Sequence, residues 1–560
     1  MATEVPGGPA DISFSSRRSA IYARRGMAAS SQPLATQAGV SILARGGNAA
    51  DAAVAMAAVL NVTEPCSTGI GGDCFSLFFD ASTGRVTALN GSGRSPAGLT
   101  LDLVLDHGLA ETAAFRDPMH AHTATVPGAC AGWCDMNERH GSMPLAEVLA
   151  PAIALAEEGF PVAPLTAYYW SAAVLPRMIS SPGGRAFLVG GRGPRPGELF
   201  RNPGLAATLR EVAEGGRDAF YTGRIARDIA RAVQEEGGVM STEDLARHRS
   251  TWDEPLSVPY RGMRIWECPP NGQGLVALLA LRILEGFDVA GLAAFSPDRW
   301  HLLIEAVRLG FADALRHVAD PSLSPVPLEQ LLSDRYARSQ RARIHPKRAI
   351  PRLLPGTLAT GSDTVYFCAV DGRGNACSFI NSNYMGFGTG IAPWEREGPR
   401  AGASRGFTLQ NRGMNFTLEP GHPNALAPSK RPYHTIIPGM ITRADGSLYG
   451  PFGVMGGFMQ PQGHVQVAVG LLDDGLDPQE ILDAPRFCVE PRHPSGLVYL
   501  EKGAPAQLAA ALSARGHEVR AGISGFERSL FGRGQVIVRR ADGVLCAGSD
   551  PRADGCAAGF

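Results

Sequence analysis

A threonine at the boundary between a loop and a strand is the feature that most constrains how this chain folds. Residues 351–362 (PRLLPGTLATGS) are rich in Pro, Gly, Thr and Ser, which indicates a loop. Residues 365–370 (VYFCAV) are β-branched, aromatic or apolar, and they predict a strand that begins at Thr364. The sequence therefore predicts a hydroxyl group held where a loop enters a strand.

This placement suits cleavage of the chain by its own side chain. The Thr364 hydroxyl can attack the carbonyl carbon of Asp363, move the acyl group from nitrogen to oxygen, and leave an ester that water hydrolyses. The released α-amine of Thr364 would titrate at about pH 7.7–8.0, where it can act as the base for its own hydroxyl. An Asp-Thr pair before a strand is more often a simple turn exit, so the hypothesis depends on the rest of the chain.

Composition indicates a globular chain without a charged partner. The 560 residues, 44% hydrophobic and 19% charged, predict two to four domains or one large α/β body, and they exclude disorder. The formal net charge of −1 favours neither nucleic acid nor an anionic membrane. We therefore expect neither nucleic acid nor a membrane as a partner.

The cysteine pattern predicts neither a disulfide scaffold nor a metal site. Ten cysteines show no CxxC pair, and no nearby His or Cys completes a zinc set around Cys130 and Cys134. The glycines of residues 69–72 precede a strand instead of opening a helix, which argues against a dinucleotide site. We expect no metal and no cofactor. Residues 1–25 show no signal peptide and no run of 18 apolar residues occurs, so we expect a cytoplasmic protein.

Hydrophobic periodicity and turn residues predict alternating helices and strands. Helices are predicted over residues 34–45, 49–60, 151–158, 202–214 and 298–318, and strands over residues 75–79, 86–89, 364–370 and 376–380. A turn at residues 371–375 is predicted to join the last two strands into a hairpin. The charged, glycine-rich residues 394–406 predict a surface loop.

Six motifs in fixed order resemble the γ-glutamyltransferase family of N-terminal-nucleophile hydrolases. They are residues 42–54 (ILARGGNAADAAV), 67–75 (STGIGGDCF), the Thr364 strand, residues 427–432 (APSKRP), Gly456-Gly457 and residues 549–555 (SDPRADG). The resemblance runs from Ala35 to Phe560.

The resemblance implies a self-processing enzyme with a four-layer αββα sandwich. Cleavage between Asp363 and Thr364 would give a large subunit, 1–363, and a small subunit, 364–560, which stay intertwined. The enzyme would pass an acyl group through an ester on Thr364 to water or an amine. The backbone N–H groups of Gly456 and Gly457 would form the oxyanion hole. Ser382 would hydrogen-bond the nucleophile, and Tyr384 would help to bind substrate.

Several positions depart from the family pattern. Where family members hold the α-ammonium of a γ-glutamyl group with a carboxylate, this chain has Asn415, and Arg412 stands where Gln or Glu is usual. His434 and Thr435 replace the paired serines that hold the α-carboxylate. The resulting site is rich in cations and poor in anions, which suits a carboxylate without an adjacent ammonium group.

The arginine that binds the substrate carboxylate in the family has no direct match. Ser92 fills the expected place, and Arg94 lies two residues away, so Arg94 is the candidate for this role.

Three functional hypotheses follow. The first is a γ-glutamyltransferase or hydrolase that cleaves γ-glutamyl amides such as glutathione. The second keeps the fold and the nucleophile but takes dicarboxylic acid monoamides such as glutaryl amides or oxamate. The third is an uncleaved, inactive homologue that acts as a binding protein. A metal-dependent hydrolase is disfavoured, because no HExxH or clustered carboxylate-histidine motif occurs.

Overall fold

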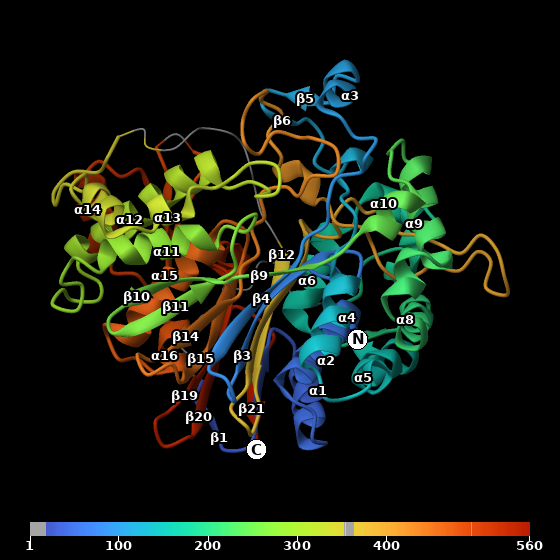
Figure 1. The fold of residues 1–560 in the computed structure, drawn as a ribbon, viewed down its shortest axis with the longest axis horizontal. Coiled ribbons are helices and arrows are strands. Elements are labelled where there is room, and N and C mark those ends of the chain that lie inside the picture. The colour runs from blue at the N-terminus through green and yellow to red at the C-terminus, as the bar shows by residue number, and fades with distance from the viewer. Residues whose placement is uncertain (1–17, 352, 354–362, 494) are drawn as a thin grey trace, which may run out of the picture.

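Two seven-stranded antiparallel sheets pack face to face in the middle of the protein, with helices on both outer sides (Figure 1). The computed structural model describes residues 18–351, 353, 363–493 and 495–560. Most of the loop predicted before Thr364 lies outside these residues. The arrangement is the predicted four-layer αββα sandwich.

The first sheet carries Thr364. Its strands, in spatial order, are β21 (Cys556–Gly559), β2 (Met27–Ser30), β12 (Asp363–Val370), β13 (Ala376–Tyr384), β3 (Asp73–Asp80), β4 (Arg85–Gly91) and β9 (Thr251–Asp253). The second sheet contains β1 (Ile21–Ala23), β20 (Leu545–Ser549), β19 (Arg533–Arg539), β15 (Leu448–Met455), β14 (Gly439–Thr442), β11 (Met263–Glu267) and β10 (Leu256–Tyr260). Apolar side chains of both sheets, including Phe75, Tyr366 and Ile537, form the core between them.

Helices cover the outer face of each sheet because each face is apolar. On the first sheet lie α1 (Pro33–Ala44), α2 (Ala49–Thr63), α4 (Ala129–His140) and α5 (Leu145–Glu158), flanked by α8 (Pro203–Tyr221) and α9 (Arg224–Glu235). On the second sheet lie α11 (Gly274–Leu284), α12 (Pro297–His317) and α15 (Met459–Leu472). Helix α2 is buried along its whole length, and Asn48 and Asp51 form a capping box at its start.

Shorter elements complete the fold. The other helices are α3 (Leu101–Asp106), α6 (Pro164–Ala173), α7 (Pro176–Ser180), α10 (Thr242–Arg247), α13 (Leu328–Leu331), α14 (Asp334–Arg341), α16 (Pro478–Asp483) and α17 (Ala506–Ala514). The other strands are β5 (Ala110–Glu111), β6 (Ala114–Phe115), β7 (Phe160–Pro161), β8 (Leu199–Phe200), β16 (Phe487–Val489), β17 (Val498–Glu501) and β18 (Val519–Ile523). Four 3₁₀ helices are η1 (Ala121–Thr123), η2 (Gly184–Phe187), η3 (Arg412–Asn415) and η4 (Gly525–Phe531).

The predicted hairpin around Thr364 is confirmed, but its second strand is longer than predicted. Strand β13 continues to Tyr384 instead of ending at Ile380. Its polar residues stay in the strand because β13 pairs on both sides, with β12 and with β3. This extension carries Ser382 and Tyr384 to the site.

Three other predictions need correction. Pro151 was predicted to start a helix, but helix α5 already begins at Leu145 and Pro151 lies inside it. The buried face of the helix extends on both sides of Pro151, from Val148 to Ala156. Helix α8 runs past residue 214 to Tyr221, across a non-helical Gly216. The predicted surface loop 394–406 is exposed in its middle and projects beside α8 and α9 (Figure 1), but Arg405 is buried against Asp228 at 2.8 Å.

None of the ten cysteines forms a disulfide, and nine of them are buried. Within the described part of the chain, none of the helices combines the length and apolar character that crossing a membrane requires.

Candidate active site

Thr364 is the second residue of β12 and is completely buried. Between the pairs Asp363–Tyr384 and Val365–Asn381, this single residue faces two residues of β13, Ser382 and Asn383. Such a bulge turns a side chain toward a chosen neighbour. It brings Thr364 Oγ1 to 3.0 Å from Ser382 Oγ.

Ser382 connects Thr364 to a buried arginine. Its Oγ accepts hydrogen bonds from the backbone N–H of Tyr384 at 2.8 Å and from Arg412 Nη2 at 3.1 Å. Either hydroxyl can donate across the contact between Ser382 and Thr364. The geometry therefore places the Thr364 hydroxyl beside a hydroxyl that a positive charge contacts.

Arg412 lies at the start of η3 and is 0% exposed. Its Nη1 donates to Thr435 Oγ1 at 2.6 Å, and its guanidinium carbon stands 4.1 Å from the centre of the Tyr384 ring. Burial lowers the pKa of Arg412 to about 10, partly opposed by Tyr384 and Asp73. Arg412 therefore stays charged at neutral pH.

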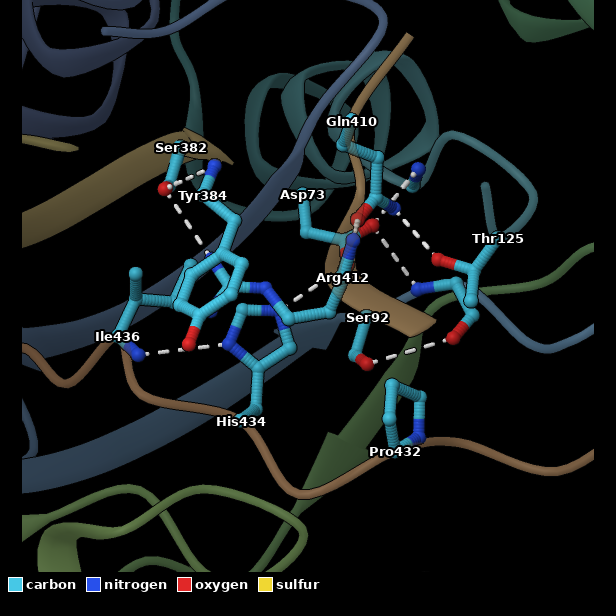
Figure 2. Close-up of polar contacts among 12 residues, drawn as sticks. Asp73, Ser92, Thr125, Ser382, Tyr384, Gln410, Arg412, Pro432, His434 and Ile436 are labelled. Atoms are coloured by element: carbon cyan, nitrogen blue, oxygen red, sulfur yellow. Dashed lines mark hydrogen bonds and ion pairs between the residues drawn. The ribbon is translucent and has the colours of Figure 1, made fainter. Parts of the chain in front are cut away.

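Asp73 and His434 form a second buried pair beside Arg412, as Figure 2 shows. Asp73 Oδ1 accepts the N–H groups of Gly93 at 2.9 Å and Gly128 at 3.1 Å. Burial raises the pKa of Asp73 to about 7, although the charge of Arg412 acts in the opposite direction. The sequence prediction missed Asp73, but its position in the motif at residues 67–75 could have pointed to it.

The hydrogen bonds of His434 define its protonation. Its Nδ1 accepts the backbone N–H of Ile436 at 3.3 Å, so its proton lies on Nε2, 3.0 Å from Asp73 Oδ2. Burial holds the pKa of His434 well below its usual value, with Arg412 and Arg431 adding to the shift. His434 is therefore a neutral donor to Asp73.

Asn415 closes the site on the side of Tyr384. Tyr384 Oη donates to Asn415 Oδ1 at 2.8 Å, and Arg492 Nη2 lies 3.3 Å from the same oxygen. Asn415 and Arg492 both line a cavity of about 300 Å³, together with Tyr433. No sequence motif pointed to Arg492, which lies 77 residues after Asn415.

Gly456 and Gly457 follow β15 directly, and their φ angles are +132° and +56°. These are conformations that favour glycine. Gln273 Nε2 donates to Gly457 O at 2.7 Å and to Thr435 O at 2.6 Å, so the glycine turn is tied to the residue that Arg412 contacts.

The structure brings most of the predicted site residues together, with one exception. Thr364, Ser382, Tyr384, Arg412 and Thr435 form one connected group with Asn415, His434 and the glycine turn around it. Half-buried Arg94 instead lies near Arg431 and His248, whose pKa values its charge helps to lower. Among the described residues, no hydrogen bond or ion pair joins Arg94 to this group, so its role stays a prediction.

A buried threonine at the start of a central strand, within an αββα sandwich, defines a hydrolase of the N-terminal-nucleophile type. Among the residues that the structure describes, no group of His, Cys, Asp or Glu could hold a metal ion.

Comparison with known proteins identifies the family. The family model described as "Gamma-glutamyltranspeptidase" matches residues 35–560, and the chain belongs to this family. The "Glutathione hydrolase-like YwrD proenzyme" of Bacillus subtilis (strain 168) is 36% identical over 539 residues, covering 95% of this chain and 98% of the relative. The "Oxamate amidohydrolase proenzyme" of Klebsiella pneumoniae is 34% identical over 546 residues, covering 96% and 98%.

A solved structure shares the whole fold. The crystal structure of cephalosporin acylase from Bacillus halodurans is 45% identical, with a TM-score of 0.89 and coverage of 99% of both chains. The named activities of these relatives differ, so the family establishes an enzyme with the N-terminal-nucleophile fold and leaves its acyl group to be argued from the site.

Proposed function

We propose that the protein is a self-processing amidase that cleaves γ-glutamyl amides such as glutathione through an ester on Thr364. The observation that carries the proposal is the 3.0 Å contact between Thr364 Oγ1 and Ser382 Oγ at the start of β12. A hydroxyl held against Ser382, on the residue that follows the peptide bond to be cut, is placed for the acyl shift that cleavage requires.

The proposed chemistry proceeds in two stages. First, Thr364 Oγ1 attacks the carbonyl carbon of Asp363, the C–N bond breaks, and water hydrolyses the ester to give chains 1–363 and 364–560. The free α-amine of Thr364 then takes the hydroxyl proton as Oγ1 attacks the substrate carbonyl, and that proton goes to the leaving amine. Water or an acceptor amine finally resolves the acyl-enzyme.

The surroundings of Thr364 support the charges that this reaction develops. Backbone N–H groups of Gly456 and Gly457 would stabilise the oxyanion, and each such donor is typically worth a factor of about 10²–10³ in rate. Arg412, buried and charged, would favour the anionic character that develops beside Ser382. Ten cysteines without a disulfide suit a reducing compartment, so we also propose a cytoplasmic location.

A second candidate substrate class is the dicarboxylic acid monoamides. The specific observation in its favour is Asn415, which presents an amide where a γ-glutamyl ammonium group would need a carboxylate. This candidate uses the same nucleophile and the same cleavage.

Self-processing is tested on a denaturing gel with intact-mass analysis of the purified protein. We expect two chains, the smaller beginning at Thr364, and we expect Thr364→Ala to remain a single chain of 59.0 kDa. A wild-type chain that stays uncut on long incubation would contradict the proposal and favour the inactive homologue. Loss of amidase activity in a chelator would instead point to a metal-dependent hydrolase.

A further inference from the structure

The cavity beside Asn415 carries an unsatisfied donor next to a positive charge. Asn415 is 3% exposed and lines the cavity, and its Nδ2 is buried without a hydrogen-bond partner among the described residues. Its Oδ1, in contrast, is held by Tyr384 and Arg492. A buried N–H group left unpaired costs about 1–3 kcal/mol. The cost is relieved when a ligand supplies an acceptor.

Arg492 lies between the cavity and the glycine turn. Its guanidinium carbon stands 4.7 Å from the ring centre of Phe458, the residue that follows Gly457. In the part of the chain that the structure describes, no carboxylate forms an ion pair with this guanidinium. Glu490 Oε1 accepts only the backbone N–H of Arg492, at 3.2 Å. The guanidinium therefore offers free donors toward a ligand.

The cavity is also connected to the residues around the candidate oxyanion hole. Tyr433 lines it and donates to Gln273 Oε1 at 3.1 Å, and Gln273 in turn holds Gly457 O and Thr435 O. Asn415 joins it to Tyr384, which lies two residues after Ser382 on β13. These hydrogen bonds tie the wall of the cavity to two segments of the candidate site, strand β13 and the glycine turn.

From these contacts we propose that Arg492 and Asn415 bind the terminal carboxylate of the substrate's acyl group. The proposal rests on the proposed function and defines its acyl group further, as a short chain that ends in an anion. Arg492 supplies a charged fork and Asn415 Nδ2 supplies the second donor, the combination that a carboxylate accepts. Arg492 would then take the role that the sequence analysis predicted for Arg94, which is to bind the carboxylate of the substrate.

The charges around the cavity favour an anion at its inner end. Glu419 also lines the cavity, but it is exposed, so water screens its charge. His422 is half-buried, and burial lowers its pKa, which keeps it neutral above pH 7. Glu419 is the one carboxylate among the described residues that line the cavity, so an ammonium group on the same acyl chain would be attracted toward Glu419 and away from Arg492.

The test compares three p-nitroanilides whose acyl groups differ in charge: glutaryl, γ-glutamyl and butyryl. We expect the wild-type protein to prefer glutaryl over butyryl in kcat/KM. Arg492→Met should lower kcat/KM for glutaryl at least tenfold, chiefly through KM, and leave butyryl within about threefold. Arg492→Lys should recover part of the loss, because it restores the charge without the fork.

A matched control separates recognition from folding. Arg443 is a second half-buried arginine over an aromatic ring, 5.4 Å from the ring centre of Tyr449, and it lies at the opposite end of β15 from the glycine turn. Arg443→Met should leave the glutaryl preference unchanged. The proposal is overturned if Arg492→Met keeps the wild-type preference, or if it lowers both substrates equally.

Calorimetry distinguishes failure of this inference from failure of the proposed function. If no anilide is hydrolysed, the proposed function fails, but glutarate should still bind the wild-type protein at least tenfold more tightly than it binds Arg492→Met. Butyrate should bind both proteins equally weakly. Glutarate binding that does not depend on Arg492, or no glutarate binding at all, overturns the inference whether or not the protein is catalytically active.

Discussion

The Ser382 hydroxyl offers the sharpest test of how the nucleophile is held. Among the described residues, Ser382→Ala removes three contacts: the 3.0 Å contact with Thr364, the bond from the Tyr384 N–H, and the bond from charged Arg412. Neutral hydrogen bonds contribute about 1 kcal/mol each, and one to a charged group contributes about 1.5–3 kcal/mol. We expect the fold to lose about 3.5–5 kcal/mol of stability.

The rate of self-cleavage should fall further than stability alone explains. If the contact with Thr364 contributes about 1.4–2.8 kcal/mol to the transition state, its loss slows cleavage about ten- to a hundredfold. The assay follows the disappearance of the full-length chain on a denaturing gel after rapid purification. Melting temperatures measured in the uncleavable Thr364→Ala background report stability separately.

Ser378 provides a matched control on the same strand. It is equally buried, and its Oγ lies 2.8 Å from Tyr366 Oη, so Ser378→Ala removes one hydroxyl contact without touching Thr364. This variant should lose about 1 kcal/mol of stability and cleave at the wild-type rate. The reasoning is refuted if Ser382→Ala cleaves as fast as wild type, or if Ser378→Ala slows cleavage to the same extent.

Three further predictions concern specificity, the glycine turn and pH. Asn415→Asp should raise the ratio of γ-glutamyl to glutaryl turnover about tenfold in a competition assay. The new carboxylate would attract the ammonium group of a γ-glutamyl substrate and would pair with Arg492, whose Nη2 lies 3.3 Å from Asn415 Oδ1. An unchanged ratio would show that Asn415 does not set specificity. Gly456→Ala should lower amidase kcat at least tenfold, since φ is +132° and a Cβ would lie 3.1 Å from Gly532 Cα. Gly446→Ala, with φ of +84° and open space around it, should strain a remote turn and spare kcat. Equal losses in the two variants would contradict a role for the glycine turn. Burial raises the pKa of Asp73 to about 7, so the stability that protonated Asp73 contributes is complete below about pH 4 and is lost as the pH rises through 7. The melting temperature of the wild type relative to that of Asp73→Asn should therefore fall between pH 4 and 8. Parallel pH profiles of the two melting temperatures would contradict this prediction.

Local sequence was sufficient for the strand pair that carries the nucleophile. The β-forming run after Thr364 and the turn at residues 371–375 predicted β12 and its hairpin, because strand propensity and turn chemistry act between neighbouring residues. The same locality explains the predicted start of α2, where Asn48 and Asp51 form the capping box. These elements depend on interactions within a few residues.

The length of β13 could not be predicted in this way. Residues 381–384 are polar or aromatic, and alone they indicate a loop. They remain in the strand because β12 and β3 satisfy their backbone groups on both sides. Strand β3 begins at Asp73, about three hundred residues earlier in the chain, so only the assembled sheet could show where Ser382 lies.

The sequence by itself determined the class of chemistry: a threonine at the start of a strand, in a chain whose ordered motifs match one family. Tertiary structure alone decided what surrounds that threonine. Asp73 meets His434 across a separation of 361 residues, and Arg492 meets Asn415 across 77. The physical reason is that burial and charge pairing depend on which distant segments pack together, whereas hydrophobic pattern and turn residues report only on the segment that contains them.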